Sequence, residues 1–356
     1  MPKTENEIGT ETGTKPPRPS RRRYVLLIAA IIVVIAGWSG AWFYGRSVLA
    51  GEIDRQIAAL DSQGIDFTCA DLAIAGFPFR YEVSCRDLQS QDRWGSGGSL
   101  GGLMAVALIY NPWHVIFEAK SPAAVTVPVN GLQGEVTFET ARASVKFSET
   151  SVGSLAAVLE KPEAAVETAF SAGLFAADMA EAHLRTVPER PDVLEGFLTV
   201  ADLRLKSLPE LQESVSLRGH IRIDGGAGLL AGADLYSLIR EKGEVPLELV
   251  LLEATLGESR VAANGDLMLD GSGTLSGSLK LDIGNAERLL QNLKPLLPRD
   301  GRTYSLLENI VKSLEPAATE IDGVRTISLP VAIDRGQIRV GFLPVGEIPP
   351  LFAAGI

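Results

Sequence analysis

The two cysteines of this 356-residue chain are the residues whose type and spacing point most directly to chemistry. Cys69 and Cys85 lie in a segment of alternating polar and apolar residues, DFTCADLAIAGFPFRYEVSCRDL, with a candidate turn at 76–78. A hairpin centred on this turn places Cys69 opposite Cys85, so we expect a cross-strand disulfide and an oxidising compartment. Two buried free thiols are the alternative. A metal site is disfavoured because zinc takes four ligands and no histidine lies near, so no metal is expected.

The sequence around Ser99, GGSLG (97–101), matches the G-x-S-x-G pattern of the nucleophile elbow in serine hydrolases. The elbow requires a buried parallel strand before the serine and a helix after it, whereas Ser99 lies in a cluster of Gly and Ser. A flexible loop is therefore the favoured interpretation, and hydrolysis at Ser99 is only a third hypothesis.

Three histidines and two glycine clusters complete the candidates for catalysis or phosphate binding. His114, His183 and His220 are far apart in sequence and form no H-E-x-x-H pair, so we expect each to be a strand residue bonded to a neighbour. The clusters 225–228 and 271–273 lack the Lys-Ser/Thr of a phosphate-binding loop and are expected to be turns.

Trp113 follows Asn111 and Pro112 and, with His114, is a candidate aromatic lip for a ligand. Because a tryptophan on a strand is more often a core residue, we favour the core interpretation. The sequence therefore predicts no catalytic residue, no cofactor and no enzymatic activity.

The elements that carry these residues begin with an uncharged, apolar stretch at 24–44, which is long enough to span a bilayer. Residues 1–23 are expected to be a disordered basic tail, and 45–64 an amphipathic helix that continues out of the span and ends near Gly64. The remaining residues, 65–356, are expected to form one β-rich domain.

Charges flanking the apolar stretch predict its orientation. The cations that lie just before it are Lys15, Arg18, Arg21, Arg22 and Arg23. Only Arg46 follows closely, so the positive-inside rule predicts a cytoplasmic N-terminus and a periplasmic body held on the inner membrane. A cleavable signal peptide with a site near 39–41 is the alternative, but the stretch is longer than the usual apolar region of a signal peptide.

The body shows mostly the period-two alternation of strands. Strands are expected at 134–147, 197–205, 216–224, 261–270, 274–283 and 326–342, and helices at 234–241, 286–297 and 304–314. The Ala-rich stretch 155–177 is a candidate further helix. This pattern predicts a mainly β (α+β) fold: an antiparallel, twisted, multi-stranded sheet with a few covering helices, preceded by one transmembrane helix.

A weak internal repeat relates GHIRIDG (219–225) and GDLMLDG (265–271), with a looser copy at 334–341. Each copy presents apolar residues on one face only. The predicted apolar stripe, a candidate lipid-binding surface, consists of Ile221, Ile223, Leu267, Leu269, Leu275, Leu279, Leu281 and Ile283. Coverage of this stripe by helices such as 286–297 is the competing expectation.

The net charge is −11, from 33 basic and 44 acidic residues. The first 23 residues hold six basic and three acidic side chains, which leaves 27 against 41, or −14, in the rest. Because phosphate backbones repel so acidic a body, we expect no nucleic-acid partner.

Several segments resemble a known family. The hairpin with GFPFR (76–80), the segment YNPWHVIFEAKSPA (110–123) and the C-terminal LPVAIDRGQIRVGFLPVGEIPPL resemble an uncharacterised alphaproteobacterial domain of unknown function. More distantly, ANGDLMLDGSGTLSGSLKLDI (263–283) followed by ERLLQNL is similar to repeats of AsmA-like envelope proteins. The second resemblance implies a single anchor and a β-sheet that holds lipid; neither implies catalytic residues.

Two function classes follow. The first is a membrane-anchored envelope protein that binds or carries lipid, which requires an apolar sheet face left partly uncovered. The second is a scaffolding envelope protein with a closed core and a protein partner.

Overall fold

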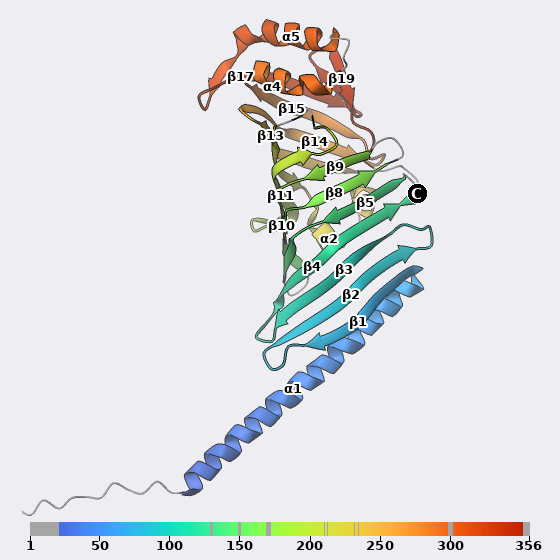
Figure 1. Ribbon diagram of the computed structural model, residues 1–356, viewed down its shortest axis with the longest axis vertical. Helices are drawn as coiled ribbons and strands as arrows, with labels where there is room; N and C mark the ends of the chain where they lie inside the picture. The colour runs from blue at the N-terminus through green and yellow to red at the C-terminus, as the bar shows by residue number, and fades with distance from the viewer. Residues whose placement is uncertain are drawn as a thin grey trace, which may run out of the picture. The chain divides into compact units, whose positions relative to one another are not determined.

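The computed structural model describes residues 21–128, 131–148, 151–168, 172–209, 211, 213–230, 232–233, 235–297 and 302–351. It divides into two compact units, Met1–Glu52 and Ile53–Ile356. The second unit contains a large antiparallel sheet with a few short helices (Figure 1). The expected mainly β fold is therefore confirmed.

The helix α1 (Arg21–Ser62) contains the uncharged stretch and continues past it into the second unit. Among the described residues it is the helix long and apolar enough to cross a membrane, a property that anchors and signal sequences share. It ends where the sequence predicts, because Gly64 adopts a positive φ of 78° and its N–H donates to the carbonyl of Asp61 at 2.8 Å.

The strands of the sheet follow one another along the chain. They are β1 (Ile65–Ala75), β2 (Arg80–Asp92), β3 (Gly97–Leu108), β4 (Asn111–Val127), β5 (Leu132–Thr137), β6 (Thr140–Phe147), β7 (Val152–Glu160), β8 (Glu163–Glu167), β9 (Ala172–Ala176), β10 (Met179–Val187), β11 (Arg190–Leu205), β12 (Val215–Ile223), β13 (Glu244–Leu256), β14 (Ser259–Asp270), β15 (Leu275–Gly284), β16 (Thr319–Ile321), β17 (Val324–Asp334), β18 (Gln337–Val340) and β19 (Leu343–Glu347).

The pairing is a meander in which most strands bond to their neighbours in sequence, and the short β16 pairs with β17 beside it. The meander runs β1–β2–β3–β4–β6–β7–β10–β11–β12–β13–β14–β15–β17–β18–β19. The strands β5, β8 and β9 pair with one another and with β4 and β11, so they continue β6, β7 and β10 past an interruption. Figure 1 shows β1 to β4 side by side.

The interruptions and irregularities of neighbouring strands line up from β1 to β11. We call this row the bulge line; it comprises Asp71, Asp87, Gly101, Ser121-Pro122, Phe138-Glu139, Lys161-Pro162, Ala177-Asp178 and Asp202. Four of its residues adopt a left-handed conformation, with φ between 47° and 52° (Asp71, Asp87, Lys161 and Asp202). Because a bulge bends its strand and increases twist, an aligned row bends the sheet along a line.

Short helices lie in two connections. α2 (Ala227–Leu230) and α3 (Leu235–Lys242) join β12 to β13, and α4 (Ala286–Leu293) and α5 (Arg302–Leu314) lie between β15 and β16, each followed by a 3₁₀ turn, η2 (Lys294–Leu296) or η3 (Glu315–Ala317). These elements confirm the helices expected at 234–241, 286–297 and 304–314, although residue 234 lies outside the described residues.

Two local predictions are wrong. The Ala-rich stretch 155–177 is not a helix: its described residues belong to β7, β8 and β9, with 169–171 outside the described part. Neighbours on both edges of β7 complete its hydrogen bonds, which outweighs the helix propensity of alanine. Likewise, the segment around Ser99 is not a flexible loop but part of β3, paired on both sides by β2 and β4.

Candidate functional site

The feature that extends furthest across the molecule is an apolar face of the sheet. Residues opposite each other in antiparallel strands point to the same side, so the register defines rows that cross the whole sheet. The central row consists of Ile74, Val83, Ala105, Phe117, Ala143, Ala157, Ala182, Leu198, Gly219, Leu252, Ala263, Leu281 and Leu329.

The rows on either side of the central row, on the same face, are equally free of charge. One consists of Tyr81, Ala107, Val115, Val145, Leu155, Leu184, Gly196, Ile221, Leu249, Gly265, Leu279, Val331 and Val340. The other consists of Cys85, Leu103, Ala119, Ala141, Leu159, Ala180, Val200, Leu217, Ala254, Val261, Ile283 and Ile327. We call this side of the sheet the apolar face, and these three rows are its middle.

The opposite side, the polar face, carries the charges. The row between two apolar rows reads Ser84, Met104, Glu118, Arg142, Val158, Glu181, Thr199, Arg218, Glu253, Ala262, Asp282 and Ser328. Opposite charges meet across strands, as where Glu253 contacts Arg260 at 2.5 Å and Arg218 at 3.6 Å. The polar face also carries apolar residues such as Met104 and Val158, but the three rows of the other side carry no charge, so the two faces suit different surroundings.

One end of the apolar face is covered. Ile239 of α3 is fully buried against Val245, Leu247 and Leu269. Of the predicted stripe, this cluster takes in Leu269 as a buried member and Ile223, Leu267 and Leu275 as partly buried neighbours. These four residues therefore form a closed core, and the covering helix is α3 rather than the one expected at 286–297.

The other four stripe residues lie on the three rows and outside this cluster: Ile221, Leu279, Leu281 and Ile283. Beside them the face is open to solvent. Leu198 and Leu252, which flank Gly219 in the central row, are 49% and 51% exposed. The face therefore combines a closed end with an open middle, and an apolar ligand would fit the open part.

Two hollows lie elsewhere. One of about 550 Å³ spans β4, β5, β8 and β9, and the side chains that line it include Gln133, Glu135 and Glu167 of the polar face. A second, of about 490 Å³, is lined by Asn264, Asp266 and Lys280 among others, again from the polar face. Both hollows are also lined by apolar residues, such as Val125 and Leu174 in the first and Leu279 and Leu329 in the second. Because charged side chains enter both, the apolar face remains the stronger candidate.

The polar face holds a buried ion cluster around Glu195 of β11. This carboxylate is almost fully buried and accepts hydrogen bonds from Arg185 at 2.6 Å and from Arg222 at 3.0 Å, while His220 lies at 2.9 Å. Burial by itself would raise the pKa of Glu195, but hydrogen bonds with His220, Arg185 and Arg222 outweigh burial and lower the pKa to about 2. Phe197 stacks on His220 at 4.1 Å and closes the cluster.

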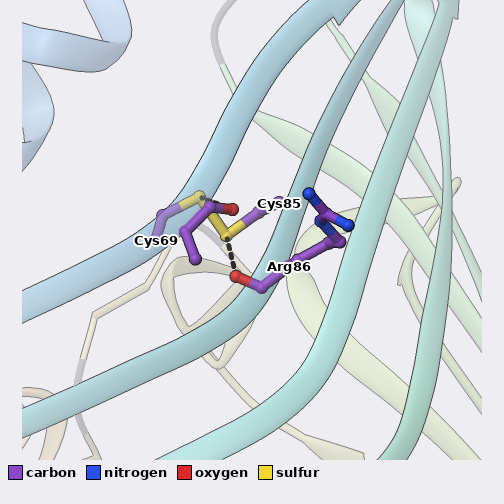
Figure 2. The surroundings of a disulfide bond; sticks show 4 residues. Cys69, Cys85 and Arg86 are labelled. Atoms are coloured by element: carbon purple, nitrogen blue, oxygen red, sulfur yellow. Dashed lines mark hydrogen bonds between the residues drawn. A yellow bond between two sulfur atoms is a disulfide. The ribbon is translucent and has the colours of Figure 1, made fainter.

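The cysteines lie at disulfide distance, with their Cα atoms 5.6 Å apart, and Figure 2 shows the bond between β1 and β2. The predicted register is wrong, however, because Cys69 lies opposite Leu88 rather than Cys85. The register already differs at the turn, where Ala75 lies opposite Glu82 rather than Phe79, so the turn is centred later in the sequence than predicted. The bulges at Asp71 and Asp87 lie on opposite strands and compensate each other, so the same offset continues to Cys69.

Of the remaining candidates, the three histidines and Ser99 are strand residues, and the prediction that Trp113 lies in the core is wrong. As expected, His114 lies 2.7 Å from the Ser144 hydroxyl, while His183 lies near Glu181 and His220 near Glu195. Ser99 lies in mid-strand between Gln89 and Ala124, where no general base is opposite it. Trp113 is not a core residue, because more than half of its surface is exposed.

Sequence reasoning missed the half of the apolar face on β3, β4, β6, β7 and β10. More than half of its residues are alanine, which alternates as regularly as the leucines of β14 and β15 but carries a weaker hydrophobic signal. Alanine or leucine occupies every second position at 155–159 and again at 180–184, and this period of two could have revealed the face.

The geometry defines a class of protein: a long antiparallel meander with one apolar and one charged face, preceded by a single apolar helix. The chain belongs to the family described as "Uncharacterized protein conserved in bacteria (DUF2125)", whose model matches residues 42–349. No curated protein matches the chain.

Proposed function

We propose that this protein binds hydrocarbon chains of lipids on its apolar face while α1 anchors it in the inner membrane with the sheet in the periplasm. The observation that carries the proposal is the central row, which crosses thirteen strands without a charge. At about 4.8 Å between strands, this row is roughly 58 Å long, which exceeds the thickness of a bilayer's hydrocarbon core.

The physical driving force would be burial of apolar area. Each Å² of hydrocarbon removed from water contributes roughly 25 cal/mol, so affinity does not require charge on the protein. The net charge of −14 outside the first 23 residues is therefore compatible with lipid binding. The distant resemblance of residues 263–283 to AsmA-like repeats agrees with the same proposal.

The proposed location rests on charge and on the cysteines. Five cations precede the apolar stretch within ten residues and Arg46 alone follows closely, which favours a cytoplasmic N-terminus. A disulfide between Cys69 and Cys85 would persist in the periplasm and not in the cytoplasm.

Photo-crosslinking tests the proposal in the full-length protein. We expect a photoreactive phospholipid to label β11–β13 as well as α1. Leu252→Asp should reduce labelling of β11–β13 several-fold because it places a charge in the open middle of the face, whereas labelling of α1 should not change. Since Leu252 is half exposed, the charge stays hydrated and folding should survive.

Ala332→Asp is the matched control, because Ala332 is exposed on the polar face of β17 opposite Arg339. It should leave both labels unchanged. Labelling confined to α1 in the unmodified protein, or equal loss in both variants, would contradict the proposal.

A scaffolding role is the second candidate, favoured by the closed cluster under α3. In that case the exposed part of the apolar face would contact a protein. Absence of lipid adducts on the sheet, together with protein adducts from a photoreactive residue at Leu252, would support the scaffold instead.

A further inference from the structure

Two neighbouring turns at one end of the sheet expose aromatic side chains and carry no charge. The β1–β2 turn contains Phe77 and Phe79, and the β3–β4 turn contains Tyr110, with Trp113 just after it. The four side chains are 51%, 62%, 77% and 57% exposed, respectively. The N–H of Ile109 donates to the carbonyl of Phe79 at 3.1 Å, which holds the turns side by side. We call residues 76–79 and 109–113 the aromatic turns.

The opposite end of the same strands has a different character. The β2–β3 turn also exposes a tryptophan, Trp94, but Arg93 lies over its ring at 5.0 Å and Asp92 accepts the N–H of Trp94 at 2.8 Å. The aromatic turns carry no charged residue, although the body has a net charge of −14. Clustered exposed rings of this kind mark a surface that meets an apolar partner.

The aromatic turns lie at the end from which the chain enters the second unit. Asp54, Ile57 and Asp61 of α1 line a hollow together with Asp66 and Phe67, so β1 runs back along the last turns of the helix. The β1–β2 turn therefore lies toward the Ile53 end of this helical segment rather than toward Ser62.

Chain length allows these turns to reach a bilayer. At about 1.5 Å per residue, the helix from Tyr44 to Ser62 is roughly 27 Å long, which limits the distance of β1 from the end of the apolar stretch. The 11 residues of β1 cover roughly 36 Å at about 3.3 Å per residue. Because β1 is longer than the helical segment that connects it to the apolar stretch, the far end of β1 can reach back to the membrane surface.

We propose that the aromatic turns insert into the headgroup layer of the bilayer that α1 crosses and fix the sheet against the membrane surface. Tyrosine and tryptophan rings favour this layer because one part of the ring is apolar and another donates a hydrogen bond. The inference rests on the proposed anchor but not on lipid binding by the apolar face.

A depth measurement tests the inference on the full-length chain, reconstituted in liposomes of phosphatidylethanolamine and phosphatidylglycerol. Trp113→Cys carries an environment-sensitive fluorophore, and Trp94→Cys, at the other end of the strands, is the matched control. We expect the label at 113 to shift to shorter wavelength and to be quenched several-fold more by spin-labelled phospholipid than the label at 94.

Three outcomes decide the inference. Equal quenching at the two positions overturns it, provided flotation shows that the anchor is in the liposomes; failed flotation instead overturns the proposed anchor. Replacing Phe79 and Tyr110 by serine should weaken quenching at 113, and no change would overturn the role of the rings. Leu252→Asp should not alter quenching at 113, because a change would indicate lipid bound on the apolar face.

Discussion

Glu195 is the residue at which the polar face depends most on electrostatics. Its carboxylate is buried, and two arginines and a histidine surround it from β10 and β12. Removing one member of a buried, bonded ion cluster leaves the others desolvated without a partner, so the cluster fixes the register of three strands.

Stability should fall in acid because of this carboxylate. The pKa of Glu195 is about 2 in the folded protein and 4.5 in its ordinary state, so its contribution is complete above about pH 4.5 and is lost as the pH falls toward 2. A shift of this size corresponds to about 3 kcal/mol. Urea unfolding of the wild type and Glu195→Gln between pH 7 and 2 measures it: the two should converge at low pH, and a constant difference would contradict this assignment.

The disulfide gives a second prediction for single residues. Changing Cys69 or Cys85 to Ser should lower the free energy of unfolding by about 2–4 kcal/mol, because the bridge restricts the unfolded chain. Alkylation of the unreduced, denatured protein should find no reactive thiol. Two reactive thiols would show that the cysteines are not joined.

Among the elements, the bulge line explains both the shape of the strands and the difficulty of deriving their register. Asp202 of β11 has a φ of 52°, and its Oδ1 accepts a hydrogen bond from the Ser214 hydroxyl at 2.8 Å. Aspartate and asparagine tolerate this left-handed conformation because their side chains bond locally, whereas β-branched residues do not.

Asp202→Val should therefore destabilise the protein by roughly 1–2 kcal/mol, and Asp202→Asn should cost much less. Thermal or urea unfolding of both variants provides the measurement. Similar losses in the two would mean that charge, rather than backbone conformation, selects aspartate at this bulge.

Sequence reasoning succeeds for strands that lack such irregularities and fails for some that contain them. Strands with unbroken alternation, such as those at 261–270 and 274–283, are predicted correctly because they lie beyond the bulge line. The hairpin register fails because the turn is centred later than the sequence indicated, with Ala75 opposite Glu82, whereas the two bulges lie on opposite strands and compensate each other. β13 is missed because its bulge near Val250 joins two alternating segments into one apolar run, LVLL (249–252).

The sequence revealed the apolar face only where leucine and isoleucine form it. The alanine-rich half becomes visible once the pairing shows that Ala143, Ala157 and Ala182 lie in one row with Leu198. Such residues carry little hydrophobic signal one by one, although together they form a continuous surface.

At the scale of the whole molecule, the orientation of the chain decides which compartment the two faces meet. Alkaline phosphatase fused after Ile356 should be active in bacterial cells, because it folds only outside the cytoplasm, and a green fluorescent protein at the same place should not fluoresce when exported by the general secretory route. The opposite pair of results would place the sheet in the cytoplasm. A mature N-terminus near residue 42 would show cleavage instead of anchoring.

The meander also has a consequence for how the chain reaches this state. Most strands bond to a strand made shortly before them, so most of the loops that must close are short and little entropy is lost in closing them. A growing chain can extend the sheet one strand at a time, starting beside α1, without waiting for its C-terminal half. At each stage the edges without a strand partner are then those of β1 and of the newest strand, which limits the backbone exposed to aggregation before the last strand is made.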